Sequence, residues 1–252
     1  MAHAGRQRLL ARLRGEIEGL ERLRSRRRAL PFGVAEIDRR LPWRGLALGA
    51  VHEVMEAGAA SEHAACAALF AGALLARLKG PVLWCLSRRD LFAPALAGVG
   101  LHPDRVIYAE ALRDAEILPL VEEGLRHRGL AGVVGEVPRL GLTASRRLQL
   151  AAEESGVTAF ILRRWRSEAE RQSADEPSAA LTRWRVLALP STPLPVPGVG
   201  RFRWQLELLR CKGAEPYSWH VEAPDETGRF GLPSDLADRS HPQERQRRTA
   251  AG

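Results

Sequence analysis

The feature that most constrains the fold is a regular alternation of short apolar runs with segments of helical periodicity. The runs at 81–87 and 130–137 are nearly continuous in apolar residues, which is typical of strands buried on both faces. Strands that alternate with helices form β-α-β units around a mostly parallel sheet, so the sequence predicts an α/β fold. The predicted strands are 50–55, 81–87, 105–110, 130–137 and 156–165, and the predicted helices are 35–41, 61–79, 90–99, 114–128 and 143–155.

The pattern changes in the last third of the chain. A polar, acidic stretch at 166–181 predicts an exposed loop. A strand is expected at 182–190, followed by a Pro/Gly-rich turn segment at 191–200. The runs at 201–212 and 217–223 alternate apolar and polar residues and are separated by Lys212–Pro216, which predicts an antiparallel hairpin. Antiparallel edge strands are therefore expected beside the parallel sheet.

The positive charge lies at the two ends of the chain. Of the net +8, residues 6–28 contribute nine arginines and three glutamates, residues 239–248 contribute four arginines and one glutamate, and the rest sums to −1. Residues 6–29 are expected to form a basic helix, which must pack on the body of the chain or on a partner. Three regions follow: a helix at 1–29, a domain at 30–232 and a charged, disordered tail at 233–252. The apolar stripe of the helix is Leu9, Leu13, Ile17 and Leu20.

Several classes of protein are disfavoured by what the sequence lacks. No apolar run is long enough for a membrane span, and the first residues lead directly into arginines without the apolar core of a signal peptide. Cys66, Cys85 and Cys211 are far apart in sequence and do not have zinc-ligand spacing. A cytoplasmic protein with no metal site and no membrane partner is expected.

The stretch from Ala50 to Leu78 reads as a strand, a small-residue turn and a long helix, which is where many α/β proteins hold a nucleotide phosphate. A working phosphate loop needs flanking glycines, a lysine for the β/γ oxygens and a Ser/Thr for Mg²⁺. The turn 56–63 has one glycine and no lysine. Glu56 and Glu62 add negative charge, and two unit charges about 5 Å apart repel by roughly 3 kcal/mol at an effective dielectric near 20.

The order of elements resembles that of the RecA/RadA recombinase core. The resemblance is carried by "LPFGVAEIDRRLPWRGLALGAVHEV", "PVLWCLSRRDLFAPALAGVGLHPDRVIYAEA" and "FILRRW…SAALTRWRVLAL…RFRWQLELLRCKG". Over Leu30–Leu232 the chain is more closely similar to the ImuA family, the RecA-like accessory proteins of bacterial damage-inducible mutagenesis. The resemblance implies a RecA-like sheet with an N-terminal basic helix, and it places a former nucleotide site at the turn 56–63.

The nucleotide-site positions that the resemblance implies are all degraded. The strand 130–137 should end in a magnesium-coordinating aspartate and carries Glu136, and the strand 81–87 is followed by Asp90, a displaced substitute for the acid that activates water. No catalytic residue and no cofactor are therefore expected. The vestigial phosphate-loop positions are Glu56, Gly58, Ser61, Glu62 and His63, and Glu136 is the vestigial Walker B position.

Basic and aromatic residues flank the predicted loop 166–181. Arginine binds phosphate bidentately and tryptophan offers a face for stacking, so the cluster is a candidate contact for single-stranded DNA or a protein partner. The acidic loop favours a protein, and the alternative is that both tryptophans lie in the core. The candidate residues are Arg163, Arg164, Trp165 and Arg166 on one side and Arg183, Trp184 and Arg185 on the other.

Two classes of function follow. The resemblance implies a non-catalytic RecA-like adaptor in SOS-type translesion DNA synthesis, with an ImuB-like Y-family homologue, an error-prone DnaE-type polymerase and RecA as candidate partners. The alternatives are a divergent RecA-like DNA-dependent ATPase and a cell-division inhibitor similar to SulA.

Overall fold

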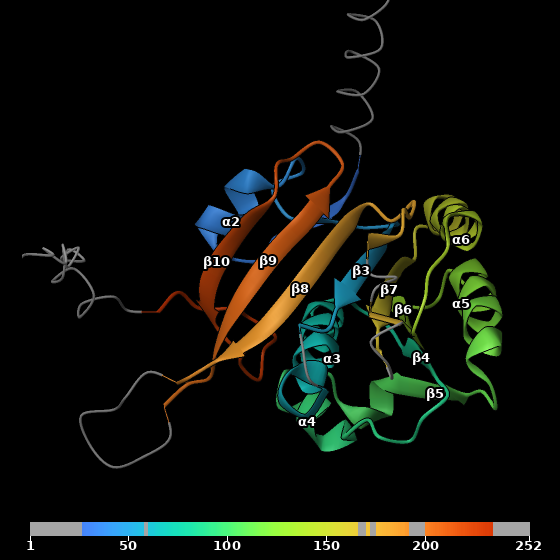
Figure 1. Ribbon diagram of the computed structural model, residues 1–252, viewed down its shortest axis with the longest axis horizontal. Helices are drawn as coiled ribbons and strands as arrows, with labels where there is room; N and C mark the ends of the chain where they lie inside the picture. Colours follow the sequence, from blue (N-terminus) through green and yellow to red (C-terminus); the bar gives the residue numbers. More distant parts are fainter. Residues whose placement is uncertain (1–26, 58–59, 166–169, 172–174, 192–199, 234–252) are drawn as a thin grey trace, which may run out of the picture.

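A computed structural model describes residues 27–57, 60–165, 170–171, 175–191 and 200–233. These residues build an eight-stranded, mostly parallel sheet in the order β10-β9-β8-β3-β7-β6-β4-β5, with helices on both faces (Figure 1). A separate two-stranded antiparallel sheet pairs β1 with β2. The architecture confirms the predicted α/β class and agrees with the RecA-like fold that the resemblance implies.

The parallel part of the sheet follows the predicted β-α-β pattern. The chain crosses from β3 over two strand positions to β4 and later returns through β6 and β7. Because β3, β7, β6 and β4 run in parallel, their carboxyl ends meet at one edge, which is where open α/β sheets bind ligands. The parallel strands are β3 (Val51–Met55), β4 (Val82–Leu86), β5 (Val106–Glu110), β6 (Gly132–Val137), β7 (Thr158–Arg163) and β8 (Thr182–Leu189).

Helices cover the two faces of the sheet and enclose two cores. Successive residues of β7 point to opposite faces: Phe160 packs with α3 in one core, and Ile161 packs with α5 in the other. The helices are α2 (Ala35–Arg40), α3 (Ala60–Ala76), α4 (Ala93–Ala97), α5 (Ile117–Arg126) and α6 (Leu142–Ser155), with short 3₁₀ turns at Pro103–Arg105 and Asp114–Glu116. Within the described residues no helix combines the length and apolarity needed to cross a membrane.

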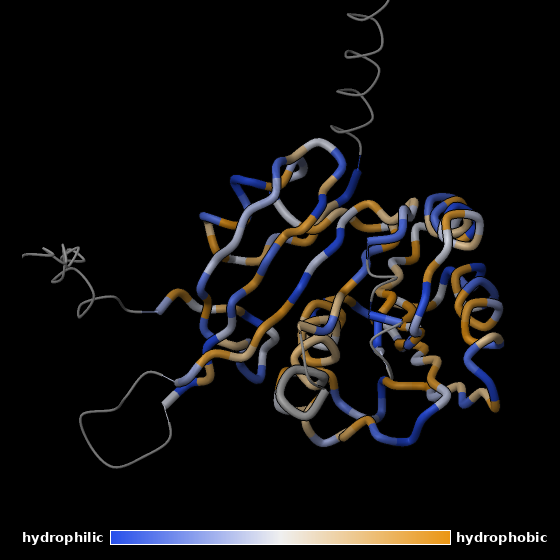
Figure 2. Tube along the Cα trace, in the orientation of Figure 1, coloured by the Kyte–Doolittle hydropathy of each residue, from blue (hydrophilic) through white to orange (hydrophobic). Residues whose placement is uncertain are grey.

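The antiparallel strands extend the sheet beyond β8. Strands β9 (Arg203–Cys211) and β10 (Tyr217–Glu222) form the predicted hairpin, and β9 also pairs with β8. Along β9, buried and half-buried residues alternate, which is visible as alternating hydropathy in Figure 2. The buried side packs Trp204 against the core, so only one face of this part of the sheet contributes to the interior.

The structure corrects several predicted boundaries. The predicted helix at 90–99 is reduced to Ala93–Ala97, and the one at 114–128 begins with a 3₁₀ turn. Ala29, expected at the end of the basic helix, lies in β1 (Ala29–Leu30), which pairs with β2 (Leu46–Ala47). Arg27 and Arg28, also expected in the basic helix, are described and are not helical. The part of the predicted helix at 1–26, including Leu9, Leu13, Ile17 and Leu20, and nearly all of the predicted disordered tail lie outside the described residues.

Candidate functional site

Four charged residues gather at the carboxyl edge of the sheet. Glu56 follows β3, Glu136 is the penultimate residue of β6, Asp90 lies in the loop after β4, and Arg164 follows β7. Each residue comes from the end of a different parallel strand, so the shared strand direction brings them to the same place. Glu56 and Glu136 are the two vestigial nucleotide-site positions for which the structure describes side chains.

The guanidinium of Arg164 binds all three carboxylates. Its Nε donates to Glu56 Oε1 at 3.2 Å, its Nη1 donates to Glu136 Oε2 at 2.6 Å and to Asp90 Oδ1 at 2.8 Å, and its Nη2 donates to Asp90 Oδ2 at 3.1 Å. These four hydrogen bonds use four of the five N–H groups of an arginine. Arg164 therefore links the ends of β3, β6 and β7 to the loop after β4.

Burial and charge act together on this group. Burial raises the pKa of Glu56, although the Arg164 guanidinium opposes the shift. The hydrogen bond from Arg164 lowers the pKa of Asp90. Burial alone would lower the pKa of Arg164, but its bonds to Asp90 and Glu136 outweigh the desolvation and raise that pKa. Arg164 is a permanent cation, and it is the counter-ion with which the buried Glu56 and Glu136 are paired.

Glu136 is engaged on both of its oxygens. While Oε2 accepts from Arg164, Oε1 accepts from Trp84 Nε1 at 2.8 Å, and the side chain is only 6% exposed. A carboxylate that coordinates Mg²⁺ in a nucleotide site instead shares the metal with substrate phosphates. Within the residues that the structure describes, no group of three or more His, Cys, Asp and Glu side chains is arranged to hold a metal ion.

An apolar groove of about 400 Å³ opens beside this charged cluster. One wall is the first half of α3 and the other is the segment around α4, while Asp90, Glu136 and Arg164 form its polar end. The apolar lining residues are Ala65, Ala67, Ala68, Leu69, Leu91, Phe92, Ala95, Leu96 and Leu162.

The other predicted phosphate-loop positions are only partly visible. Gly58 lies outside the described residues. Ser61, Glu62 and His63 fall in the first turn of α3, and their side chains are also outside what the structure describes. The predicted order of strand and helix is confirmed, with β3 ending at Met55 and α3 beginning at Ala60, so the last part of the predicted turn is helical.

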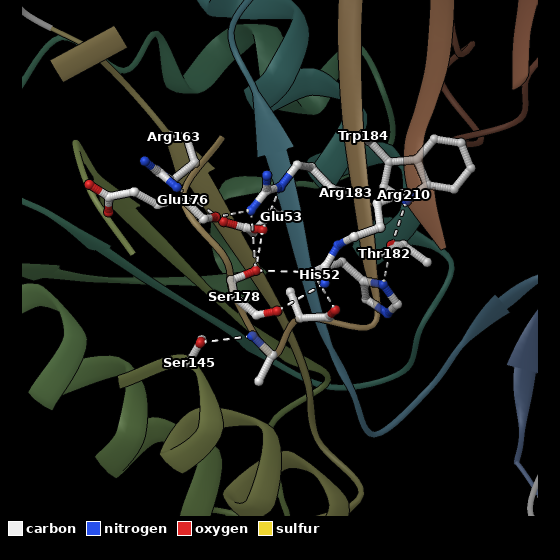
Figure 3. Close-up of polar contacts among 12 residues, drawn as sticks. His52, Glu53, Ser145, Arg163, Glu176, Ser178, Thr182, Arg183, Trp184 and Arg210 are labelled. Carbon is white, nitrogen blue, oxygen red and sulfur yellow. Dashed lines mark hydrogen bonds and ion pairs between the residues drawn. The ribbon is translucent and has the colours of Figure 1, made fainter. Parts of the chain in front are cut away.

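A second polar cluster is buried within the sheet, on the side of α6 (Figure 3). Its centre is Glu53 of β3, which has no solvent exposure. Arg163 Nη1 donates to Glu53 Oε1 at 3.1 Å, and Arg183 Nε donates to Glu53 Oε2 at 2.8 Å. Burial lowers the pKa of Arg163, and the charge of Glu53 opposes that shift. Three neighbouring strands, β3, β7 and β8, are thus joined by one carboxylate.

The same cluster fixes the segment that leads into β8. Ser178 Oγ donates to Glu53 Oε2 at 2.6 Å, and Arg183 Nη2 donates to the carbonyl of Glu176 at 2.8 Å. Arg210 of β9 donates to the carbonyls of Ser178 and Ala180 at 2.9 and 2.8 Å. The last part of the predicted exposed loop 166–181 is therefore held to the sheet by side chains from three strands, and its residues Ser178, Ala180 and Leu181 are buried, which corrects that prediction.

His52 lies on the opposite face of β3 and is fully buried. Its Nδ1 is 2.7 Å from Thr182 Oγ1 and its Nε2 is 2.8 Å from the carbonyl of Ala47, while Trp184 Nε1 donates to the same hydroxyl at 2.7 Å. The carbonyl can only accept, so Nε2 carries the proton and Nδ1 accepts from the hydroxyl. Burial lowers the pKa of His52 to about 4, although the hydrogen bond to Ala47 opposes the shift.

Three of the residues predicted to form a basic and aromatic contact surface are buried, which contradicts that prediction for them. Arg163 and Trp184 have no exposure and Arg183 is buried in the Glu53 cluster, so these three side chains do not reach a surface that DNA or a partner can touch. Alternation along the strands explains this outcome, because both arginines point toward Glu53 and Trp184 points into the opposite core.

The remaining predicted contact residues have separate roles. Arg164 belongs to the carboxylate cluster, and Trp165 donates its backbone N–H to Glu56 Oε2 at 3.4 Å. Arg185 is half-exposed on β8 and pairs with Glu207 of β9. Arg166 lies outside the described residues. Trp165 is only partly buried. A contact with DNA or a partner at Trp165, Arg185 and Arg166 stays a prediction.

Sequence reasoning did not identify Glu53 as a hub or Arg164 as a shared counter-ion. The available signal was the placement of Glu53, Glu56 and Glu136 in or next to apolar strands. Acidic residues are almost never fully buried unless they are paired, so such positions require cations nearby. The adjacent arginines of the strand at 156–165 are the residues that supply this charge.

Comparisons with known proteins identify the family. No family model matches the chain. Two curated proteins, each named "Protein ImuA" and coming from Caulobacter vibrioides strains NA1000 / CB15N and ATCC 19089 / CIP 103742 / CB 15, are each 40% identical to it over 222 residues. The match covers 83% of this chain and 90% of each relative. The chain therefore belongs to the ImuA family.

Proposed function

We propose that the chain is a non-catalytic RecA-like adaptor in damage-inducible mutagenesis, acting in translesion DNA synthesis. It recruits or regulates an ImuB-like Y-family homologue and an error-prone DnaE-type polymerase, with RecA as a further candidate partner. Membership in the ImuA family supports the role in mutagenesis.

The observation that carries the proposal is the commitment of Arg164 to three carboxylates. Phosphoryl transfer depends on cationic groups that hold the phosphates and on a metal ion that bridges them. At the carboxyl edge of this sheet the cation bonded to these acids is Arg164, which uses four N–H groups on Glu56, Asp90 and Glu136. After pairing, three carboxylates and one guanidinium leave the cluster with a net negative charge, which opposes a triphosphate.

A steady-state ATPase assay tests the absence of catalysis. The full chain is incubated with Mg²⁺ and ATP, with and without single-stranded DNA. No turnover above the protein-free background is expected in either condition. Turnover that disappears in Glu136→Ala would contradict the proposal and would favour the divergent ATPase.

A co-purification experiment tests the partners. The tagged chain is mixed with purified ImuB-like protein or with FtsZ, the target expected for a SulA-like inhibitor. Retention of the ImuB-like protein and not of FtsZ is the expected result. Retention of FtsZ alone would assign the chain to cell-division control.

A further inference from the structure

We propose that the apolar groove beside Arg164 is the docking site for a short segment of a partner protein that carries apolar side chains next to a basic one. The inference rests on the proposed non-catalytic function, which leaves this edge of the sheet free for a partner. It deepens that function by naming where on the chain a partner binds and what chemistry the bound segment has.

The apolar part of the groove fits side chains from a peptide. Its volume of about 400 Å³ lies at the lower end of the range for ligand sites, roughly 300–1,000 Å³, and suits a few side chains better than a whole domain surface. Phe92 stands at the rim with 70% exposure, although it is a large aromatic residue. Exposed aromatic side chains beside a hydrophobic depression are typical of protein-binding anchors.

The polar end of the groove selects the charge of the occupant. Asp90, Glu136 and Glu56 outnumber the single cation Arg164 to which all three are bonded. Asp90 keeps 44% of its side chain exposed, so one carboxylate of the cluster faces solvent at the groove. Arg88 is exposed nearby and its charge acts on Asp90, but it does not line the groove, and the three carboxylates still outnumber the two arginines. The local excess of negative charge favours a lysine or arginine on the partner and disfavours nucleic-acid phosphates.

Fluorescence anisotropy with two synthetic peptides tests this charge preference. Both are helices of about four turns, roughly 14 residues, with leucines on one face and glutamine at most other positions. One carries lysines beside the leucines and the other carries glutamates at the same places, with the same uncharged fluorophore. The full chain has a net charge of +8, so nonspecific attraction favours the glutamate peptide. The groove predicts the opposite order, with the lysine peptide binding roughly tenfold more tightly or better.

Variants of the groove connect the binding to its location. Ala65→Trp fills the groove from an exposed helix position, and Phe92→Ala removes the rim aromatic, so both are expected to weaken the lysine peptide roughly tenfold. Asp90→Asn is expected to reduce the preference for lysine over glutamate. Leu150→Ala is the matched control, because Leu150 is also an exposed apolar residue, 66% exposed, but lies on α6 away from the groove.

Four results would overturn the inference. They are equal or stronger binding of the glutamate peptide, binding of the lysine peptide that neither Ala65→Trp nor Phe92→Ala weakens, displacement of that peptide by a single-stranded oligonucleotide, and self-association of the chain that Ala65→Trp abolishes. The last two would assign the groove to nucleic acid or to a second copy. The ATPase assay is independent, so failure of the docking site leaves the proposed non-catalytic function in place.

Discussion

Arg164 is an arginine at the carboxyl edge of the sheet that binds three carboxylates, at a place where the sequence predicts only a lack of positive charge. The sequence shows glutamates and no lysine around the turn 56–63, and this predicts repulsion of a polyphosphate. In the structure, Glu56 and Glu136 are paired with Arg164, which also binds Asp90, so the cation bonded to these acids is already shared by three carboxylates. Buried carboxylates with a fixed internal counter-ion form a closed network, whereas a nucleotide site must leave its cations free for the ligand.

Arg164→Met is expected to lower the free energy of unfolding by about 3 kcal/mol, because it leaves Glu56 and Glu136 buried without a cation. Urea denaturation measures the change. The control is Arg126→Met, since Arg126 also binds two glutamates but is 60% exposed, and its loss should cost at most about 1 kcal/mol. Equal effects of the two substitutions would mean that Arg164 does not hold the cluster together.

His52 predicts a pH dependence of stability. Its pKa in the folded chain is about 4, below the 6.5 of an unperturbed histidine, so the unfolded chain binds the proton more readily. This residue therefore stabilises the fold fully above pH 6.5, and the contribution is lost as the pH falls toward 4. At pH 5 the loss amounts to about 2 kcal/mol.

Comparison with His52→Gln isolates this contribution, because glutamine does not titrate. Urea denaturation of both proteins from pH 8 to pH 5 should show a steeper loss of stability for the unsubstituted chain. Parallel pH profiles of the two proteins would contradict the prediction, because they would show that folding does not lower the pKa of His52.

At the scale of elements, the order and type of strands and helices could be predicted, since hydrophobic periodicity reports burial directly. The hairpin β9–β10 was predicted by alternation and a polar turn. The β1–β2 sheet was not, because two-residue strands contain too few positions for a periodic signal. The shortening of α4 was also missed: Pro94 stands near its start and Gly98 at its end, and tertiary packing decides where such a helix begins.

Gly135 allows α5 to approach the sheet closely. A Cβ at Gly135 would lie 2.5 Å from Val121 Cγ2 of α5, and valine cannot move aside easily because it is branched at Cβ. Gly135→Ala is therefore expected to destabilise the fold by about 1–3 kcal/mol in urea denaturation. Gly129→Ala is the matched control, because a Cβ there meets nothing within 4 Å, and it should be neutral. A neutral Gly135→Ala would show that α5 can shift away from β6.

At the scale of the whole molecule, the parallel sheet brings the ends of four strands together and the antiparallel hairpin widens the sheet away from α5 and α6 (Figure 1). The sequence predicts this architecture, and it places the candidate nucleotide-site residues at the carboxyl ends of the parallel strands. It does not predict the partners of individual arginines, because alternation along a strand gives the face of a residue but not which carboxylate from another strand it meets. Arg163 and Arg164 are adjacent and serve two different clusters for this reason.

The central claim is that the carboxyl edge is closed to a nucleotide by its own internal ion pairs. Isothermal titration calorimetry of the full chain with Mg²⁺ and a non-hydrolysable ATP analogue tests it most directly. No saturable heat is predicted, corresponding to a dissociation constant weaker than about 1 mM. Saturable, Mg²⁺-dependent binding in the micromolar range that is lost in Glu136→Ala would contradict the claim.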